Sequence, residues 1–69
     1  MTEDERLVAL VHDLRTPLTI VQGFADLLTR RAATLSEDER DEYIARILAA
    51  ANDMKAILDE ERAQRLSAS

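Results

Sequence analysis

One short segment, residues 11–19, holds the side chains best suited to chemistry. It reads Val-His-Asp-Leu-Arg-Thr-Pro-Leu-Thr and contains His12 and Pro17, the only histidine and the only proline of the chain. An exposed imidazole is largely neutral at pH 7, so it offers a nitrogen lone pair that can attack phosphorus. Positive charge then develops on the ring, and the neighbouring carboxylate of Asp13 can orient the ring or accept its other proton.

Helical spacing places further polar side chains on the face of His12. Thr16 follows it by four residues and Thr19 by seven, and Gly23 extends this track of small residues. The track leaves room for another protein to approach the imidazole. A threonine one turn away can hold a water molecule for hydrolysis of a phosphohistidine, and Arg15 can pair with a carboxylate or a phosphate.

A simpler interpretation of the same residues also stands. A single exposed histidine on a helix is usually a solvated residue without a role. Pro17 lacks the N–H that would donate to the carbonyl oxygen of Asp13, so it predicts a bend just after His12. Spacing alone fits either a kink that packing tolerates or a hinge that moves the histidine.

Composition limits both the fold and the function. With 69 residues, the chain is too short to favour a stable core of its own. Without cysteine it has no disulfide, and one histidine alone does not make a metal site. Its net charge of -5 disfavours nucleic-acid binding. One glycine, one proline and 3% aromatic residues favour helix over sheet. The apolar runs are too short to span a membrane and the start is acidic, so we expect no signal peptide, no membrane contact and a cytoplasmic location.

Hydrophobic periodicity predicts two long helices joined by a short turn. Apolar residues recur at steps of three and four, and capping patterns at Thr2 and at Ser36 with Glu39 mark the two helix starts. The predicted segments are a helix over about 3–32, a turn over 33–36 and a helix over about 37–66. A connection this short makes the helices antiparallel neighbours.

Both predicted helices carry apolar faces too wide for one partner helix to cover. The rows are Leu7, Leu14, Val21 and Leu28 in the first helix, and Ile44, Ile47, Ala51, Met54 and Leu58 in the second, with Tyr43 at the edge. Pairing two hairpins covers these faces, although a longer parent chain is a competing explanation. We therefore predict an all-α fold with one domain over residues 1–69, an antiparallel two-helix hairpin that dimerises into a four-helix bundle.

The segment that contains His12 resembles the H-box of two-component sensor histidine kinases. His-Asp-Leu-Arg-Thr-Pro-Leu-Thr is followed by Gly-Phe at 23–24 and Leu-Leu at 27–28, as in that motif. About residues 5–58 resemble the dimerisation and histidine-phosphotransfer domain that carries the H-box. The family more often has glutamate at the position of Asp13, and aspartate is shorter but keeps the carboxylate.

The resemblance implies a role for each residue of the motif. His12 is the expected phosphoacceptor, and Asp13 is the expected general base or orienting carboxylate. Thr16 matches the threonine that supports phosphatase activity toward the response regulator by positioning water, and Pro17 matches the family's bend. The chain is then part of a protein-histidine kinase, a phosphotransferase.

The resemblance also implies partners and excludes a resident cofactor. With Gly23 as its single glycine, the chain has no glycine-rich phosphate loop, so ATP and Mg²⁺ belong to a catalytic domain that this chain lacks. The chain alone cannot phosphorylate itself, and it relays phosphate from that domain to an aspartate of a response regulator receiver domain. We expect the receiver to contact about residues 46–53 and the exposed residues after His12, namely Arg15, Thr16, Thr19, Ile20 and Gly23. The alternative is a non-catalytic module that pairs with a histidine kinase or docks a response regulator without phosphotransfer. In that case binding does not change when His12 is lost.

Overall fold

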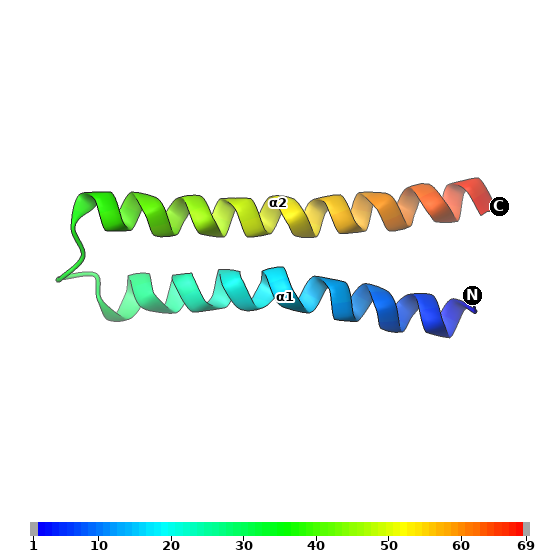
Figure 1. Ribbon diagram of the computed structural model, residues 1–69, viewed down its shortest axis with the longest axis horizontal. Helices are drawn as coiled ribbons and strands as arrows, with labels where there is room; N and C mark the ends of the chain where they lie inside the picture. Colours follow the sequence, from blue (N-terminus) through cyan, green and yellow to red (C-terminus); the bar gives the residue numbers. More distant parts are fainter. Residues whose placement is uncertain (1, 69) are drawn as a thin grey trace.

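The chain folds into two antiparallel α-helices, as the computed structural model shows for residues 2–68 (Figure 1). Helix α1 spans Glu3–Arg30 and helix α2 spans Glu37–Ala68. The start of α1 and the end of α2 lie at one end of the hairpin, and the connecting turn lies at the other. The longest extent of the Cα atoms is 51 Å. The predicted all-α antiparallel hairpin is therefore confirmed.

Each helix begins with a capping box. The Glu5 N–H donates to Thr2 Oγ1 at 3.1 Å, and the Thr2 N–H donates to Glu5 Oε2 at 3.4 Å. Ser36 and Glu39 make the same reciprocal pair, with both bonds at 3.1 Å. Because these bonds satisfy N–H groups that the first helical turn leaves without partners, they fix both helix starts locally.

Helix α1 ends at Arg30, short of the predicted end near residue 32. The chain turns directly afterwards, because the carbonyl oxygen of Arg31 accepts from the N–H groups of both Thr34 and Leu35, at 2.9 and 3.0 Å. The bond from Thr34 joins residues three apart, which is tighter than the α-helical spacing of four, and no glycine marks the change in the sequence.

Helix α2 continues to Ala68, beyond the predicted end near residue 66. The bond from Arg65 Nε to Glu61 Oε1, at 2.9 Å, joins residues four apart and supports its last turns. The helix thus includes residues 67–68, and Ser69 lies outside the described residues.

The helices meet along a row of apolar residues, which we name the seam. Its members alternate in steps of three and four along both helices, the spacing of knobs-into-holes packing. They are Leu10, Leu14, Pro17, Val21, Phe24 and Leu28 of α1, and Tyr43, Ile47, Ala50, Met54 and Ile57 of α2. Among the described side chains, only Pro17 and Ala50 are buried.

An aromatic pair sets the register of the seam. The rings of Phe24 and Tyr43 lie 5.2 Å apart between centroids, at an interplanar angle of 45°. Equal steps of one heptad from this pair bring Pro17 opposite Ala50. Tyr43, predicted at the edge of the apolar row, instead belongs to the seam, because its ring packs against Phe24.

Several large apolar side chains remain exposed outside the seam. The exposed face comprises Leu7, Val8, Val11, Leu18, Ile44, Leu48 and Leu58. Leu7 departs from its predicted row, since Leu14, Val21 and Leu28 are half-buried. The reason is that Arg6 turns toward α2 at this level and approaches Glu61. Despite these apolar faces, neither described helix has a stretch long and apolar enough to cross a membrane.

Candidate functional site

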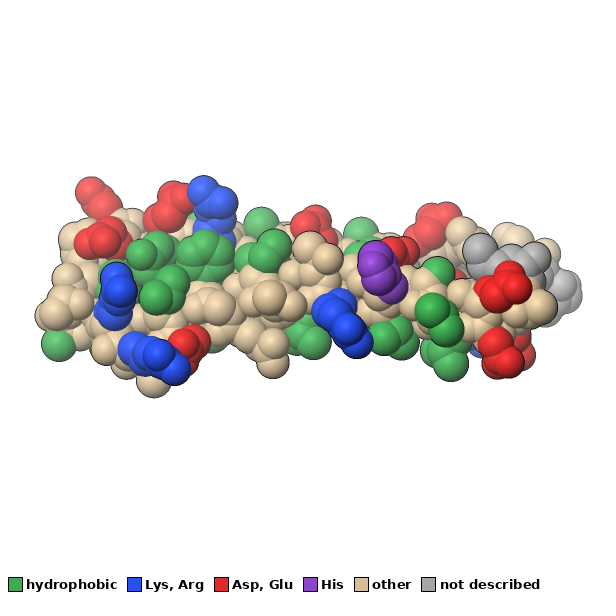
Figure 2. Space-filling model, turned by 60° about the horizontal axis from the view of Figure 1, so that its bottom comes forward, with side chains coloured by type: hydrophobic (Ala, Val, Ile, Leu, Met, Phe, Trp, Pro, Cys, Tyr) green, Lys and Arg blue, Asp and Glu red, His purple; other side chains and the backbone are tan. Residues whose placement is uncertain are grey.

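His12 stands out from the surface of α1, between the middle of the molecule and the end where the chain starts (Figure 2). Its side chain is 83% exposed, so the imidazole is open to an approaching partner. His12 and Arg15 line one side of a shallow hollow of about 400 Å³, whose other lining residues are Leu7, Val8 and Val11. The hollow is therefore formed by α1 alone and is largely apolar, with charge only beside the histidine.

Asp13 approaches one nitrogen of the imidazole. Its Oδ1 atom lies 3.5 Å from His12 Nδ1, and the Asp13 side chain is 62% exposed. This distance is an electrostatic contact, longer than a hydrogen bond. Nδ1 therefore faces a carboxylate, and Nε2 is left without a hydrogen-bond partner in the described chain.

Two residues weaken the helical hydrogen bonding one turn after His12. Pro17 is buried inside α1 and has no N–H, so the carbonyl oxygen of Asp13 loses its intrahelical donor. Thr19 Oγ1 donates to the carbonyl oxygen of Arg15 at 2.8 Å, a bond that favours helix bending. The segment beside the histidine thus lacks one backbone hydrogen bond of the regular helix, at the carbonyl oxygen of Asp13.

Thr16 lies one turn along α1 from His12 and is exposed. Its hydroxyl group makes no hydrogen bond with the described residues, unlike that of Thr19, which is occupied by the Arg15 carbonyl. Arg15 is also exposed and forms no ion pair within the described chain. A hydroxyl group and a guanidinium group are therefore both free near the imidazole.

A second hollow lies farther along α1, toward the turn. It has a volume of about 300 Å³ and is lined by Thr19, Ile20, Gly23, Phe24 and Leu27. Ile20 is 40% exposed, so it reaches the surface and does not complete the seam. A Cβ atom on Gly23 would meet nothing within 4 Å, which shows that this glycine leaves open space above the helix.

A groove between the two helices lies beside Asp13 and was not predicted from the sequence. It has a volume of about 360 Å³, and its floor includes Leu10 and Ile57, with Arg6 and Glu61 farther along. Small side chains at Ala9 and Ala56 open this space, but only the register of the helices shows that they line the same groove. Asp13 therefore lies between the imidazole of His12 and an interhelical groove.

The structure thus separates the predicted residues into two neighbouring groups. His12, Asp13 and Arg15 gather around the imidazole, whereas Thr19, Ile20 and Gly23 share the second hollow. Within the described part of the chain, no cluster of three or more histidine, cysteine, aspartate or glutamate side chains could hold a metal ion. The arrangement offers a nucleophile with an adjacent carboxylate, next to a surface with room for a second protein.

Comparison with known families gives one match. The model of the His Kinase A (phospho-acceptor) domain matches residues 4–67 of the chain. No curated protein and no solved structure gives a significant match. The matched range includes nearly all of both helices and every candidate site residue from His12 to Gly23.

Proposed function

Because the chain belongs to the family of His kinase A phospho-acceptor domains, we propose that His12 is the residue that accepts the phosphoryl group. Domains of this family are the phosphoacceptor and dimerisation modules of histidine kinases in two-component systems. The observation that carries the proposal is the exposed imidazole of His12, with Nδ1 3.5 Å from the Asp13 carboxylate and Nε2 free.

Nε2 is the nucleophile in the proposed reaction. Its lone pair forms a bond to the γ-phosphorus of ATP, while the bond from that phosphorus to the β,γ-bridging oxygen breaks and ADP leaves with the electron pair. The ring then carries a positive charge and a proton on Nδ1, which the Asp13 carboxylate stabilises and accepts. ATP and Mg²⁺ enter with a kinase catalytic domain outside these 69 residues, in the cytoplasm.

The next proposed step transfers the group to a response regulator. A carboxylate oxygen of a receiver-domain aspartate attacks phosphorus, and the N–P electron pair returns to the imidazole of His12. The hollow of Thr19, Ile20 and Gly23 lies on the same helix and supports docking of the receiver beside the histidine. Arg15, free of an ion pair in the described chain, offers a charge to a carboxylate or to the phosphoryl group.

Thr16 and Pro17 take supporting roles in this proposal. The free hydroxyl group of Thr16 positions a water molecule that hydrolyses the phosphorylated receiver, which gives the phosphatase activity. Pro17 is the hinge: it removes a backbone hydrogen bond just after His12 and lets that part of α1 change direction when a partner docks.

We also propose that the chain acts as a homodimer. Leu18 is 42% exposed and Leu48 is 60% exposed, although both lie on long, regular helices with apolar neighbours. Exposed apolar faces of this extent indicate an interaction surface. A second hairpin covers them in a four-helix bundle, the usual arrangement for two paired helical hairpins.

Phosphotransfer in trans tests the proposed phosphoacceptor. The chain is incubated with a histidine-kinase catalytic domain, Mg²⁺ and radiolabelled ATP. The labelled chain is then treated with acid, because acid hydrolyses phosphohistidine. We expect labelling of the native chain, none of His12→Gln, and an initial rate for Asp13→Asn that is lower by about a hundredfold. Asp41→Asn, which removes an exposed carboxylate from α2 outside residues 46–53, is the matched control and should keep the native rate. Acid-stable label, or label that survives in His12→Gln, would contradict the assignment.

A further inference from the structure

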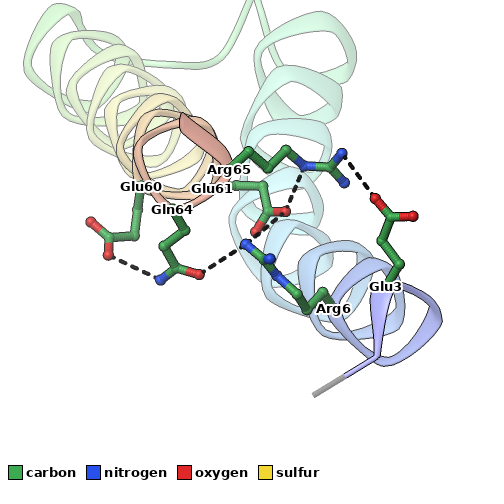
Figure 3. A network of polar contacts seen from close by, with 6 residues as sticks. All are labelled: Glu3, Arg6, Glu60, Glu61, Gln64 and Arg65. Atoms are coloured by element: carbon green, nitrogen blue, oxygen red, sulfur yellow. Dashed lines mark hydrogen bonds and ion pairs between the residues drawn. The ribbon is translucent and has the colours of Figure 1, made fainter. Parts of the chain in front are cut away.

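Charged and polar side chains join the two helices at the end of the hairpin where α1 starts and α2 ends (Figure 3). This terminal cluster consists of Glu3 and Arg6 of α1 and Glu60, Glu61, Gln64 and Arg65 of α2. Arg6 Nη2 donates to Gln64 Oε1 at 3.3 Å and lies 3.7 Å from Glu61 Oε1. Gln64 in turn donates to Glu60 Oε1 at 3.1 Å.

Glu61 is the centre of the terminal cluster. Besides Arg6, it pairs with Arg65, whose Nε donates to Glu61 Oε1 at 2.9 Å. Arg65 then extends to α1, where its Nη1 lies 3.6 Å from Glu3 Oε1. One carboxylate of α2 is thus bound by two arginines. Arg6 comes from α1 and also binds Gln64 of α2, and Arg65 comes from α2 and also approaches Glu3 of α1.

Glu61 occupies a position where the spacing of the seam calls for an apolar side chain. It follows Ile57 by four residues, which continues the alternation of three and four along α2. Its side chain is only 16% exposed, and that of Arg6 is 23% exposed. A carboxylate covered to this degree has lost much of its hydration, so the negative charge of Glu61 is stabilised chiefly by its two arginine partners.

The middle of the hairpin is held together in a different way. There Pro17 faces Ala50, and both are buried without a charged partner. The helices diverge from this section toward the terminal end (Figure 1), where long arginine, glutamate and glutamine side chains span the gap. Ion pairs contribute less than apolar burial and are weakened by salt, so the terminal end should open more easily than the middle.

We propose that the terminal cluster is an ionic latch, which closes this end of the hairpin and can open while the section around Pro17 and Ala50 stays packed. The latch and the site share the interhelical groove of about 360 Å³, which is lined by Arg6 and Glu61 at one end and by Asp13 at the other. Opening the latch widens that groove and changes the surroundings of the carboxylate next to His12. The latch is therefore a conformational device that links the packing at this end of the hairpin to the surroundings of Asp13, whether or not His12 is phosphorylated.

Amide hydrogen exchange along the whole chain tests the latch. Isolated helical turns are marginal in water, so terminal turns that lose their partner helix should fray and exchange faster. We expect Glu61→Gln to raise exchange of the amides at 8–12 and 57–64 by about two- to fivefold, with no change at 18–24 and 43–50. Raising the NaCl concentration from about 0.05 M to about 0.5 M should raise the exchange rate of the same terminal amides in the native chain, relative to the rate of the central amides.

Two further variants show whether the effect belongs to the latch. Asp59→Asn removes a carboxylate that bonds only within α2, to Lys55 at 2.8 Å, and should leave exchange at the native rate. Glu61→Leu puts an apolar side chain into the seam, so it should slow terminal exchange and reduce its salt response, with the pair of Arg65 and Glu3 left in place. Equal effects of Glu61→Gln and Asp59→Asn would overturn the proposal. Faster exchange of the central amides in Glu61→Gln, or a salt response in Glu61→Leu as large as that of the native chain, would also overturn it.

Discussion

Ala50→Leu should destabilise the hairpin, because Ala50 is a buried position of the seam with a small side chain. Ala50 is 3% exposed and lies opposite the buried ring of Pro17. A leucine at this position adds three carbon atoms where the seam has no space for them. The helices must separate or the leucine must leave its preferred rotamer, and either change weakens packing on both sides.

The expected loss follows from the cost of overpacking a filled contact. That cost is about 1–3 kcal/mol in the free energy of unfolding. In a chain of this size, each kcal/mol lowers the melting temperature by about 4–8 °C. Thermal unfolding followed by circular dichroism measures the shift, at one fixed chain concentration because dimerisation makes the melting temperature depend on concentration.

Ala45→Leu is the matched control for this prediction. Ala45 lies on the same helix but is exposed, so the substitution makes the same change in helix propensity without entering the seam. Its effect should stay within about 0.5 kcal/mol. If Ala50→Leu melted at the temperature of Ala45→Leu or above it, the close contact of Pro17 with Ala50 would not be what holds the middle of the hairpin.

Three more outcomes are expected. Light scattering should give twice the 7.8 kDa mass of the chain, and Leu48→Glu should give a monomer; a native monomer at micromolar concentration would contradict the homodimer. Thr16→Ala should keep the phosphorylation of His12 but lose dephosphorylation of a phosphorylated receiver domain, and unchanged dephosphorylation would exclude its role. The hydrogen bond from the Ser36 backbone amide holds the pKa of Glu39 below its ordinary value of 4.5, so its stabilisation of α2 is complete above that pH and is lost as the pH falls through the lowered pKa. Acid unfolding should therefore depend less on pH in this range for Glu39→Gln than for the native chain, and parallel pH profiles would show that the capping bond contributes nothing.

Local features of the fold could be predicted from the sequence. The capping box of Ser36 and Glu39 acts within one turn, so its residues identify the start of α2 without knowledge of the other helix. The exposure of His12 follows in the same way from its position outside the apolar rows. The end of α1 was less predictable, because backbone bonds to the Arg31 carbonyl end it and no glycine announces them.

Features that depend on how one helix is rotated against the other could not be predicted. The apolar pattern placed Leu7 in the seam, yet Arg6 faces α2 at that level because Glu61 lies opposite. Glu61 lies in the polar stretch Glu60-Glu61-Arg62, whose composition does not show that one of its carboxylates faces the other helix. The same limit applies to the groove beside Asp13, since its two walls come from residues more than 40 positions apart.

Nitrogen NMR of the phosphorylated chain tests the central claim most directly. His12 is the only histidine, so labelling with [¹⁵N]histidine gives a single imidazole whose two nitrogens are resolved without assignment to a position. After incubation with a histidine-kinase catalytic domain, ATP and Mg²⁺, the phosphorus coupling should appear on Nε2, while Nδ1, the nitrogen 3.5 Å from Asp13, stays free of phosphate. Phosphate on Nδ1 would contradict the proposed role of Asp13, and a phosphorylated chain with an unchanged imidazole would contradict the assignment of His12 as the phosphoacceptor.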